Sequence, residues 1–160
     1  MPDELEPNFP MGTPDETELF LRFLRFLRGA VIRKLDGLSE ADARWTPEGA
    51  LIPLIGIVNH LTHVEWRWID GAMLGAQTSR SEAEFTPGPE LTVEPAIAAY
   101  RQRAAATDAA VWSIATLSEP TKLGDGTDLR FVLVHLINET ARHAGHADAT
   151  RQLLDGTAGE

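Results

Sequence analysis

Apolar side chains recur three and four residues apart along the first third of the chain, which is the spacing of one face of an α-helix. Thr13, Pro14 and Glu16 form a capping box with a proline at the first helical position. The pattern therefore predicts a helix that is capped at Thr13 and runs to about Leu38. Residues 1–12 contain prolines and little periodicity, and they predict an irregular arm.

Further helices follow the same kind of pattern. The sequence predicts a capped turn at residues 39–42, a second long helix at 53–74, a third helix capped by Thr92 and a fourth at 129–154, capped by Asp128. Between the second and third helices, residues 75–91 contain two prolines and two glycines and predict a surface loop, a candidate cover for a site. No strand alternation or internal repeat is apparent, so we expect an all-α fold, a four-helix bundle, with residues 1–160 forming a single domain.

Charge and composition narrow the classes of partner. The net charge of −10 and a pI near 4.9 leave no basic patch for a phosphate backbone, so we expect no nucleic acid partner. No apolar run approaches the roughly 18 residues of a membrane span, and the acidic N-terminus does not resemble an export signal. The expected location is cytoplasmic, without membrane association. Because the chain has no cysteine, any metal ligands must be nitrogen or oxygen atoms.

The histidines cluster in two of the predicted helices: His60 and His63 in the second, and His135, His143 and His146 in the fourth. At about 100° per residue, the three of the fourth helix lie with Glu139 within about 80° around its axis. Glu139 and His143 are four residues apart, so both side chains can reach one ion.

His60 lies at the edge of the buried arc of the second helix and is better placed than His63 to be a third ligand. Two imidazoles and a carboxylate form the open, three-ligand arrangement of catalytic zinc and related sites. Histidines at helical spacing are also common on helix surfaces, and Glu139 with His143 is also an ordinary helical pair. The residues alone leave both readings open.

Other polar residues on these helices are candidates for a site. His146 lies one turn beyond His143 and is a candidate ligand or catalytic base. Arg67, Arg142 and Arg151 are candidates for binding the carboxylate of a substrate or cofactor. Each of these residues also has a simpler reading as a solvated or paired surface side chain.

Two segments carry a resemblance to a known family. Residues 129–156, LRFVLVHLINETARHAGHADATRQLLDG, and residues 59–68, NHLTHVEWRW, resemble the DinB-like superfamily, specifically its DUF664 branch, which is related to mycothiol-dependent maleylpyruvate isomerase. The resemblance implies a four-helix bundle with a metal bound by one histidine of the second helix and two residues of the fourth. The matching positions here are His60, Glu139 and His143.

The resemblance also implies a class of reaction. The better characterised members are similar to thiol transferases, in which the metal lowers the pKa of a low-molecular-weight thiol and the thiolate attacks an electrophile or isomerises a double bond. Without a cysteine in the chain, the thiol has to be a cosubstrate. The expected function is a metal-dependent transferase or isomerase, with zinc as the leading divalent metal ion and nickel, iron or manganese as alternatives.

Two other functions remain open at this point. The protein could be a noncatalytic module that forms a homodimer through an apolar helix face, with the metal only joining the second helix to the fourth. It could also be a metal-assisted hydrolase, in which a bound water attacks an ester or amide and His146 acts as the base.

Overall fold

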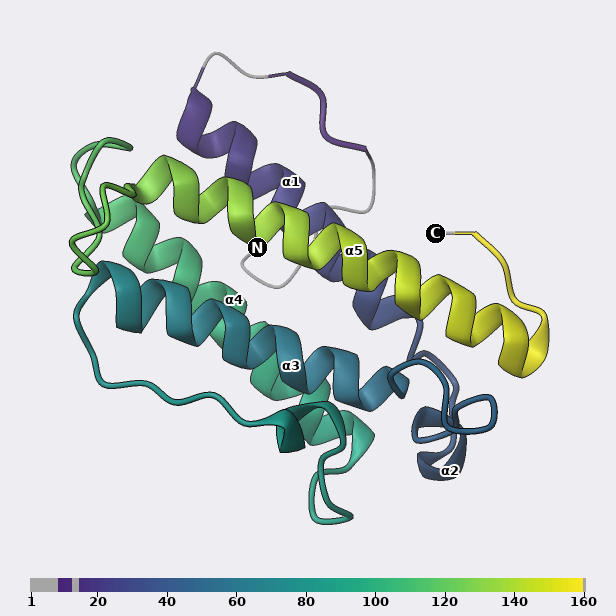
Figure 1. The fold of residues 1–160 in the computed structure, drawn as a ribbon. Coiled ribbons are helices and arrows are strands. Elements are labelled where there is room, and N and C mark those ends of the chain that lie inside the picture. The colour runs from purple at the N-terminus through teal and green to yellow at the C-terminus, as the bar shows by residue number, and fades with distance from the viewer. Residues whose placement is uncertain (1–8, 13–14, 160) are drawn as a thin grey trace.

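The computed structural model describes residues 9–12 and 15–159, and the regular structure in this part of the chain is helical. The elements are α1 (Glu16–Arg33), α2 (Glu40–Ala43), α3 (Leu54–Trp66), the π-helix η1 (Arg67–Met73), the 3₁₀-helix η2 (Glu82–Phe85), α4 (Val93–Ser113) and α5 (Leu129–Asp155). α1 packs along α5 and α3 packs along α4, while α5 also contacts α3 (Figure 1). The predicted all-α four-helix bundle is confirmed.

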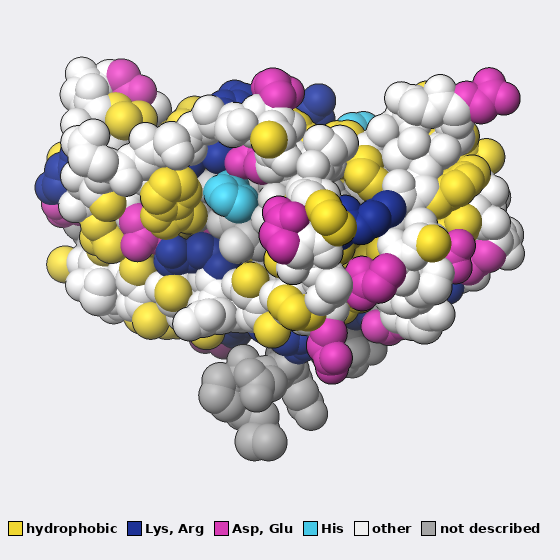
Figure 2. Space-filling view, turned by 90° about the horizontal axis from the view of Figure 1, so that it is seen from below, with side chains coloured by type: hydrophobic (Ala, Val, Ile, Leu, Met, Phe, Trp, Pro, Cys, Tyr) yellow, Lys and Arg dark blue, Asp and Glu magenta, His cyan; other side chains and the backbone are white. Residues whose placement is uncertain are grey.

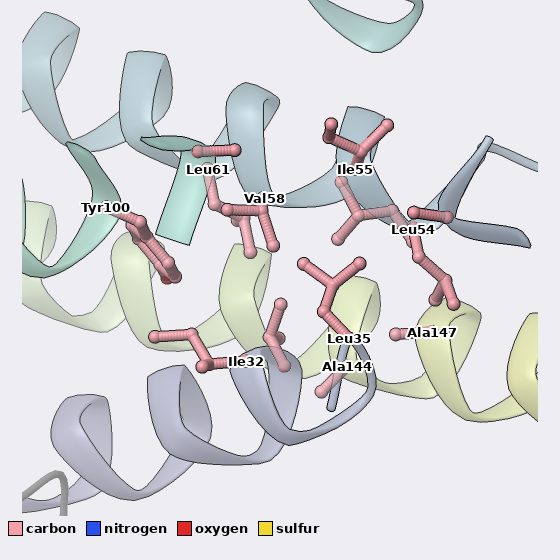
Figure 3. Close-up of a cluster of buried hydrophobic side chains, with 13 residues drawn as sticks. Ile32, Leu35, Leu54, Ile55, Val58, Leu61, Tyr100, Ala144 and Ala147 are labelled. Atoms are coloured by element: carbon pink, nitrogen blue, oxygen red, sulfur yellow. The ribbon is translucent and has the colours of Figure 1, made fainter. Parts of the chain in front are cut away.

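The core lies between the four long helices. Figure 3 shows the cluster in which Ile32 of α1, Leu54 and Val58 of α3, Tyr100 of α4 and Ala147 of α5 pack together. A second cluster joins the first half of α1 and α5 to the end of α4 through Leu21, Leu24, Val111, Leu133 and Leu136. Burying one leucine side chain contributes roughly 1.5–3 kcal/mol, so these clusters are the main source of stability.

The start of α1 differs from the prediction. The helix begins at Glu16, and Asp15 is its N-cap, because the Asp15 carboxylate accepts a hydrogen bond of 2.7 Å from the amide of Glu18. The predicted cap at Thr13 was therefore wrong; Thr13 and Pro14 themselves lie outside the described residues, as does most of the predicted arm.

The end of α1 also comes earlier than the apolar pattern suggested. After Arg33 the α-helix changes to a series of turns, in which the amide of Leu35 donates to the carbonyl of Ile32, three residues back, at 2.9 Å. Gly37 then adopts a φ of 72°, in the left-handed region that glycine enters without a steric penalty. Leu35 remains buried, so the pattern identified a core contact correctly but not the extent of the helix.

The other helix starts follow the predicted caps with one change. Asp128 caps α5 as expected, and Gly156 ends it in the left-handed conformation. Thr92 occupies the N-cap of α4, but its side chain makes no capping bond. The carboxylate of Glu40 instead accepts from the amide of Val93 at 3.0 Å, which ties α2 to the start of α4.

A buried ionic network joins three of the long helices. Arg28 of α1 is fully buried, and its guanidinium donates to the carboxylate of Glu65 on α3 at 2.7 and 2.8 Å and to Asp108 on α4 at 2.9 Å. Burial by itself lowers the pKa of Arg28, but the charge and hydrogen bonds of Glu65 raise it above its ordinary value. Arg28 is therefore a charged member of the core.

The surface carries side chains of both charge signs. Figure 2 shows one face, on which acidic, basic and hydrophobic side chains are interspersed and a histidine side chain comes to the surface near the middle. Among the helices that the structure describes, none has the length and apolar character needed to cross a membrane.

Replacing Arg28 by alanine should lower the free energy of unfolding by about 3–5 kcal/mol, because the carboxylate of Glu65 would stay buried without its counter-charge. Urea denaturation measures this loss. The matched control is Arg130→Ala, which removes an exposed ion pair with Glu16 and should leave the free energy of unfolding almost unchanged. Similar losses in both variants would contradict the role assigned to the buried network.

Candidate metal centre

Three side chains meet between α3 and α5. His60 comes from α3, and Glu139 and His143 come from successive turns of α5; one ligand atom from each lies within 4.8 Å of the other two. The Nε2 atoms of His60 and His143 lie 3.9 and 3.8 Å from the same atom, Oε2 of Glu139. The structure thus brings together the three residues that the sequence pattern singled out as ligands.

Helix packing explains this convergence. Ala144 and Ala147, one and four residues beyond His143 along α5, belong to the core cluster that α5 shares with α1 and α3, and this packing holds the ligand-bearing face of α5 beside α3. His60 and His143 are both buried, with 4% and 9% of their surface exposed, while the Glu139 side chain is 21% exposed. The site is therefore set into the wall of the bundle and open to solvent on the side of Glu139.

The hydrogen bonds of the two imidazoles differ. Nδ1 of His60 lies 3.0 Å from Oε1 of Glu84, and the Phe85 ring stacks on the His60 ring with 4.2 Å between centroids. Nδ1 of His143 is buried and has no hydrogen-bond partner among the described residues. Neither Nε2 atom has a hydrogen-bond partner in the described part of the chain, so both can serve as ligand atoms.

The electrostatics favour uncharged imidazoles. Burial, followed by the charge of the neighbouring His60, lowers the pKa of His143 to about 4. Burial also lowers the pKa of His60, although the hydrogen bond and charge of Glu84 act in the opposite direction. Both rings are therefore neutral at pH 7, which is the protonation state that a metal ligand requires.

The donor set fits a divalent metal ion. Zinc binds histidine nitrogen and carboxylate oxygen at about 2.0–2.2 Å, so ligand atoms 3.8–3.9 Å apart suit a single ion. Three protein ligands leave further coordination positions for water or substrate, as in catalytic sites. The same nitrogen and oxygen donors also suit nickel, iron and manganese.

A cavity of about 310 Å³ opens beside the three residues. Its wall combines apolar and cationic side chains, namely Val64, Trp68, Phe85, Arg67, Arg80 and Arg142. Because the ligand atoms lie in this wall, a molecule in the cavity would lie next to a bound ion. The mixed lining suits a small molecule with an apolar part and a negatively charged group.

The three arginines that were predicted to bind a substrate or cofactor lie in different surroundings. Arg67 lines the cavity, but its guanidinium is held by the Glu84 carboxylate at 2.8 and 3.0 Å. Arg142 is 67% exposed at the cavity and lies 4.0 Å from Glu139. Arg151 is not among the cavity residues, because it donates to the carbonyls of Lys34 and Asp36 and pairs with Asp155.

Sequence reasoning missed Arg80, which lies at the cavity in the segment predicted to be an irregular loop. It is exposed and comes from the long connection that runs back along the outside of α3 (Figure 1). Only the fold brings this connection to the site, so no local pattern in the sequence marks Arg80.

The remaining histidines take different positions. His146 is exposed, lines the cavity and has its ring centroid 5.3 Å from that of His143. His135 also lines the cavity and packs on Trp68, with 4.5 Å between the ring centroids. His63 points elsewhere: its Nδ1 donates to the carbonyl of Asn59 at 2.7 Å, and it lies outside the ligand group.

Two short helices near the site depart in detail from the predicted helix at 53–74 and the predicted loop at 75–91. Residues 67–73 continue α3 as a π-helix, in which the amide of Leu74 reaches the carbonyl of Ile69, five residues back. Such segments recur at functional sites, and Arg67 and Trp68 of this one face the cavity. Within the predicted loop, η2 carries Glu84, whose carboxylate is the partner of both His60 and Arg67.

Comparison with known proteins agrees with this picture. A family model described as Mycothiol-S-transferase matches residues 19–156, which confirms the family resemblance of the sequence. A crystal structure described as "conserved protein of locus from Enterococcus faecalis" matches 91% of this chain and 100% of its own chain, with a TM-score of 0.58 and 17% identity. That likeness concerns the fold alone. Comparison with curated proteins found no match.

His143 should make the stability of the metal-free protein depend on pH. Its pKa is about 4 in the folded protein and ordinarily 6.5, so between these values the unfolded chain binds a proton that the folded protein does not. Stability should therefore fall as the pH drops from 6.5 toward 4. Urea denaturation with a chelator present should show a smaller pH slope for His143→Gln than for the wild type, and equal slopes would contradict the assignment.

Proposed function

We propose, from the premise that the chain belongs to the mycothiol-S-transferase family, that it is a metal-dependent transferase or isomerase that uses a low-molecular-weight thiol. His60, Glu139 and His143 are the proposed ligands, and zinc is the proposed metal. Mycothiol is the thiol that family membership favours. The second substrate is a small electrophile bound in the neighbouring cavity.

The convergence of three nitrogen and oxygen donors in a cavity wall is the observation that carries this proposal. A metal that only tied helices together would be better enclosed, as structural sites are. Here the Glu139 side keeps solvent access, and two core clusters hold the helices together without the ion. These features favour a catalytic role over a noncatalytic module.

The chain's own residues supply binding and positioning. When bound, a divalent ion at this position supplies Lewis-acid chemistry that lowers the pKa of a coordinating thiol. His60 and His143 offer neutral rings to that ion, while Phe85 and Trp68 give the cavity apolar walls that exclude water from part of it. Since the chain has no cysteine, the reacting sulfur belongs to the cosubstrate.

Charge at the cavity suggests the kind of electrophile. Arg80 and Arg142 both lie at the cavity and are exposed, whereas Arg67 is already paired with Glu84. We assign Arg80 and Arg142 to a negatively charged group, such as a carboxylate, on the thiol or the electrophile. His146, exposed in the same cavity, is the proposed proton acceptor for the thiol.

Metal content should distinguish the proposed ligands from other histidines. We expect about one divalent ion per chain in wild-type protein, measured by plasma mass spectrometry, and little in His60→Ala or Glu139→Ala. The matched control is His63→Ala, which changes the same helix outside the ligand group and should keep its metal. Wild-type protein that takes up no zinc, nickel, iron or manganese would refute the proposed function.

Replacement of His146 by glutamine should separate proton transfer from metal binding. If His146 accepts the thiol proton, kcat should fall about 10²–10⁴-fold while the metal content stays at the wild-type level. Steady-state kinetics with mycothiol and a panel of carboxylate-bearing electrophiles measures this. An unchanged kcat would remove His146 from the reaction, and turnover of esters without a thiol would favour hydrolysis instead.

A further inference from the structure

The 3₁₀-helix η2 places the carboxylate of Glu84 beside the His60 ring of the candidate metal centre. The Glu84 side chain is 4% exposed, and its Oε1 atom lies 3.0 Å from Nδ1 of His60. The same carboxylate accepts two hydrogen bonds from Arg67, at 2.8 and 3.0 Å. Glu84 is therefore an almost fully buried acid whose two hydrogen-bonded side-chain partners among the described residues belong to the cavity wall, while Nδ1 of His63 lies 3.9 Å from its Oε2.

The backbone of η2 around Glu84 also makes specific contacts with α3. A Cβ atom at Gly56 would lie 1.8 Å from the carbonyl oxygen of Phe85, so α3 needs glycine there for η2 to dock. The side-chain amide of Asn59 donates to the carbonyl of Glu84 at 2.8 Å. The Phe85 ring covers one face of the His60 ring. These contacts hold η2 at one height along α3, beside His60.

A carboxylate at this distance determines the state of a neutral imidazole. An ionised acid only accepts hydrogen bonds, so the ring nitrogen next to it has to carry the proton. The guanidinium of Arg67 donates two hydrogen bonds to the Glu84 carboxylate, at 2.8 and 3.0 Å, and this paired geometry holds the acid in its ionised form. With the proton on Nδ1, the lone pair of His60 is on Nε2, the atom that faces Glu139.

We infer that Glu84 is a positioning residue, which holds His60 in the Nδ1-protonated tautomer and directs its Nε2 atom toward the metal position. The inference rests on the proposed metal site. His143 lacks such support, because its Nδ1 has no hydrogen-bond partner among the described residues. Of the two proposed histidine ligands, His60 is therefore the one oriented by an outer carboxylate, and Glu84 controls it from outside the coordination sphere.

The tautomer can be measured without any metal. ¹⁵N NMR of histidine-labelled, metal-free protein should show His60 protonated at Nδ1 in the wild type and a mixture of tautomers in Glu84→Ala. Glu84→Gln keeps a carbonyl acceptor and should retain the wild-type tautomer in part. The matched control is Glu82→Ala, which removes an exposed carboxylate from the same turn and should leave the His60 signals unchanged.

Metal affinity gives the second readout. Competition with a chelator should show zinc binding about 10- to 100-fold weaker in Glu84→Ala than in the wild type, a smaller loss in Glu84→Gln and none in Glu82→Ala. Circular dichroism establishes whether each variant is folded, and Glu84→Gln provides the comparison if Glu84→Ala is not.

The outcomes separate this inference from the proposed function. Wild-type protein that binds zinc with the same affinity as both Glu84 variants would overturn the inference and leave the metal site standing. A wild-type His60 protonated at Nε2 would overturn it as well. Wild-type protein that binds no metal would refute the proposed function, while the NMR measurement would still decide whether Glu84 sets the tautomer.

Discussion

A charged side chain at the centre of a helical bundle has to be neutralised where it lies, because water cannot reach it. Arg28 meets this requirement through Glu65 and Asp108, and these two partners come from different helices. Only a narrow range of helix positions gives the guanidinium both partners at once. The network therefore constrains α1, α3 and α4 relative to one another, and the apolar clusters pack within that arrangement.

This constraint bears directly on the candidate metal centre. Glu65 holds α3 from one side, while His60, five residues earlier on the same helix, faces α5 on another. Core packing of Ala144 and Ala147 holds α5 in the arrangement in which the three ligand atoms meet. The rigid part of the bundle thus sets the ligand positions, and the shorter segments η1 and η2 add the cavity wall and the carboxylate of Glu84.

The positions of the charged and uncharged side chains around the site follow from this arrangement of helices. Glu84 pairs with Arg67, and burial keeps the two histidines neutral, so the inner part of the site presents uncharged rings to a cation. Arg80 and Arg142 line the same cavity and are exposed. The cavity therefore combines the three candidate metal ligands with two exposed cationic side chains, an arrangement that would attract an anionic molecule.

The sequence by itself determined the helices, most of their caps and the three candidate ligands, because helical periodicity and the spacing of Glu139 and His143 are local properties. It could not determine the burial of Arg28, which depends on carboxylates 37 and 80 residues away along the chain. Nor could it identify Glu84 or Arg80 as part of the site. Both come from a connection with no periodicity, whose position is decided by contacts with α3, such as the close approach of Phe85 to Gly56. Tertiary structure alone decided these features, because the free energy that fixes them comes from contacts between segments distant in the sequence.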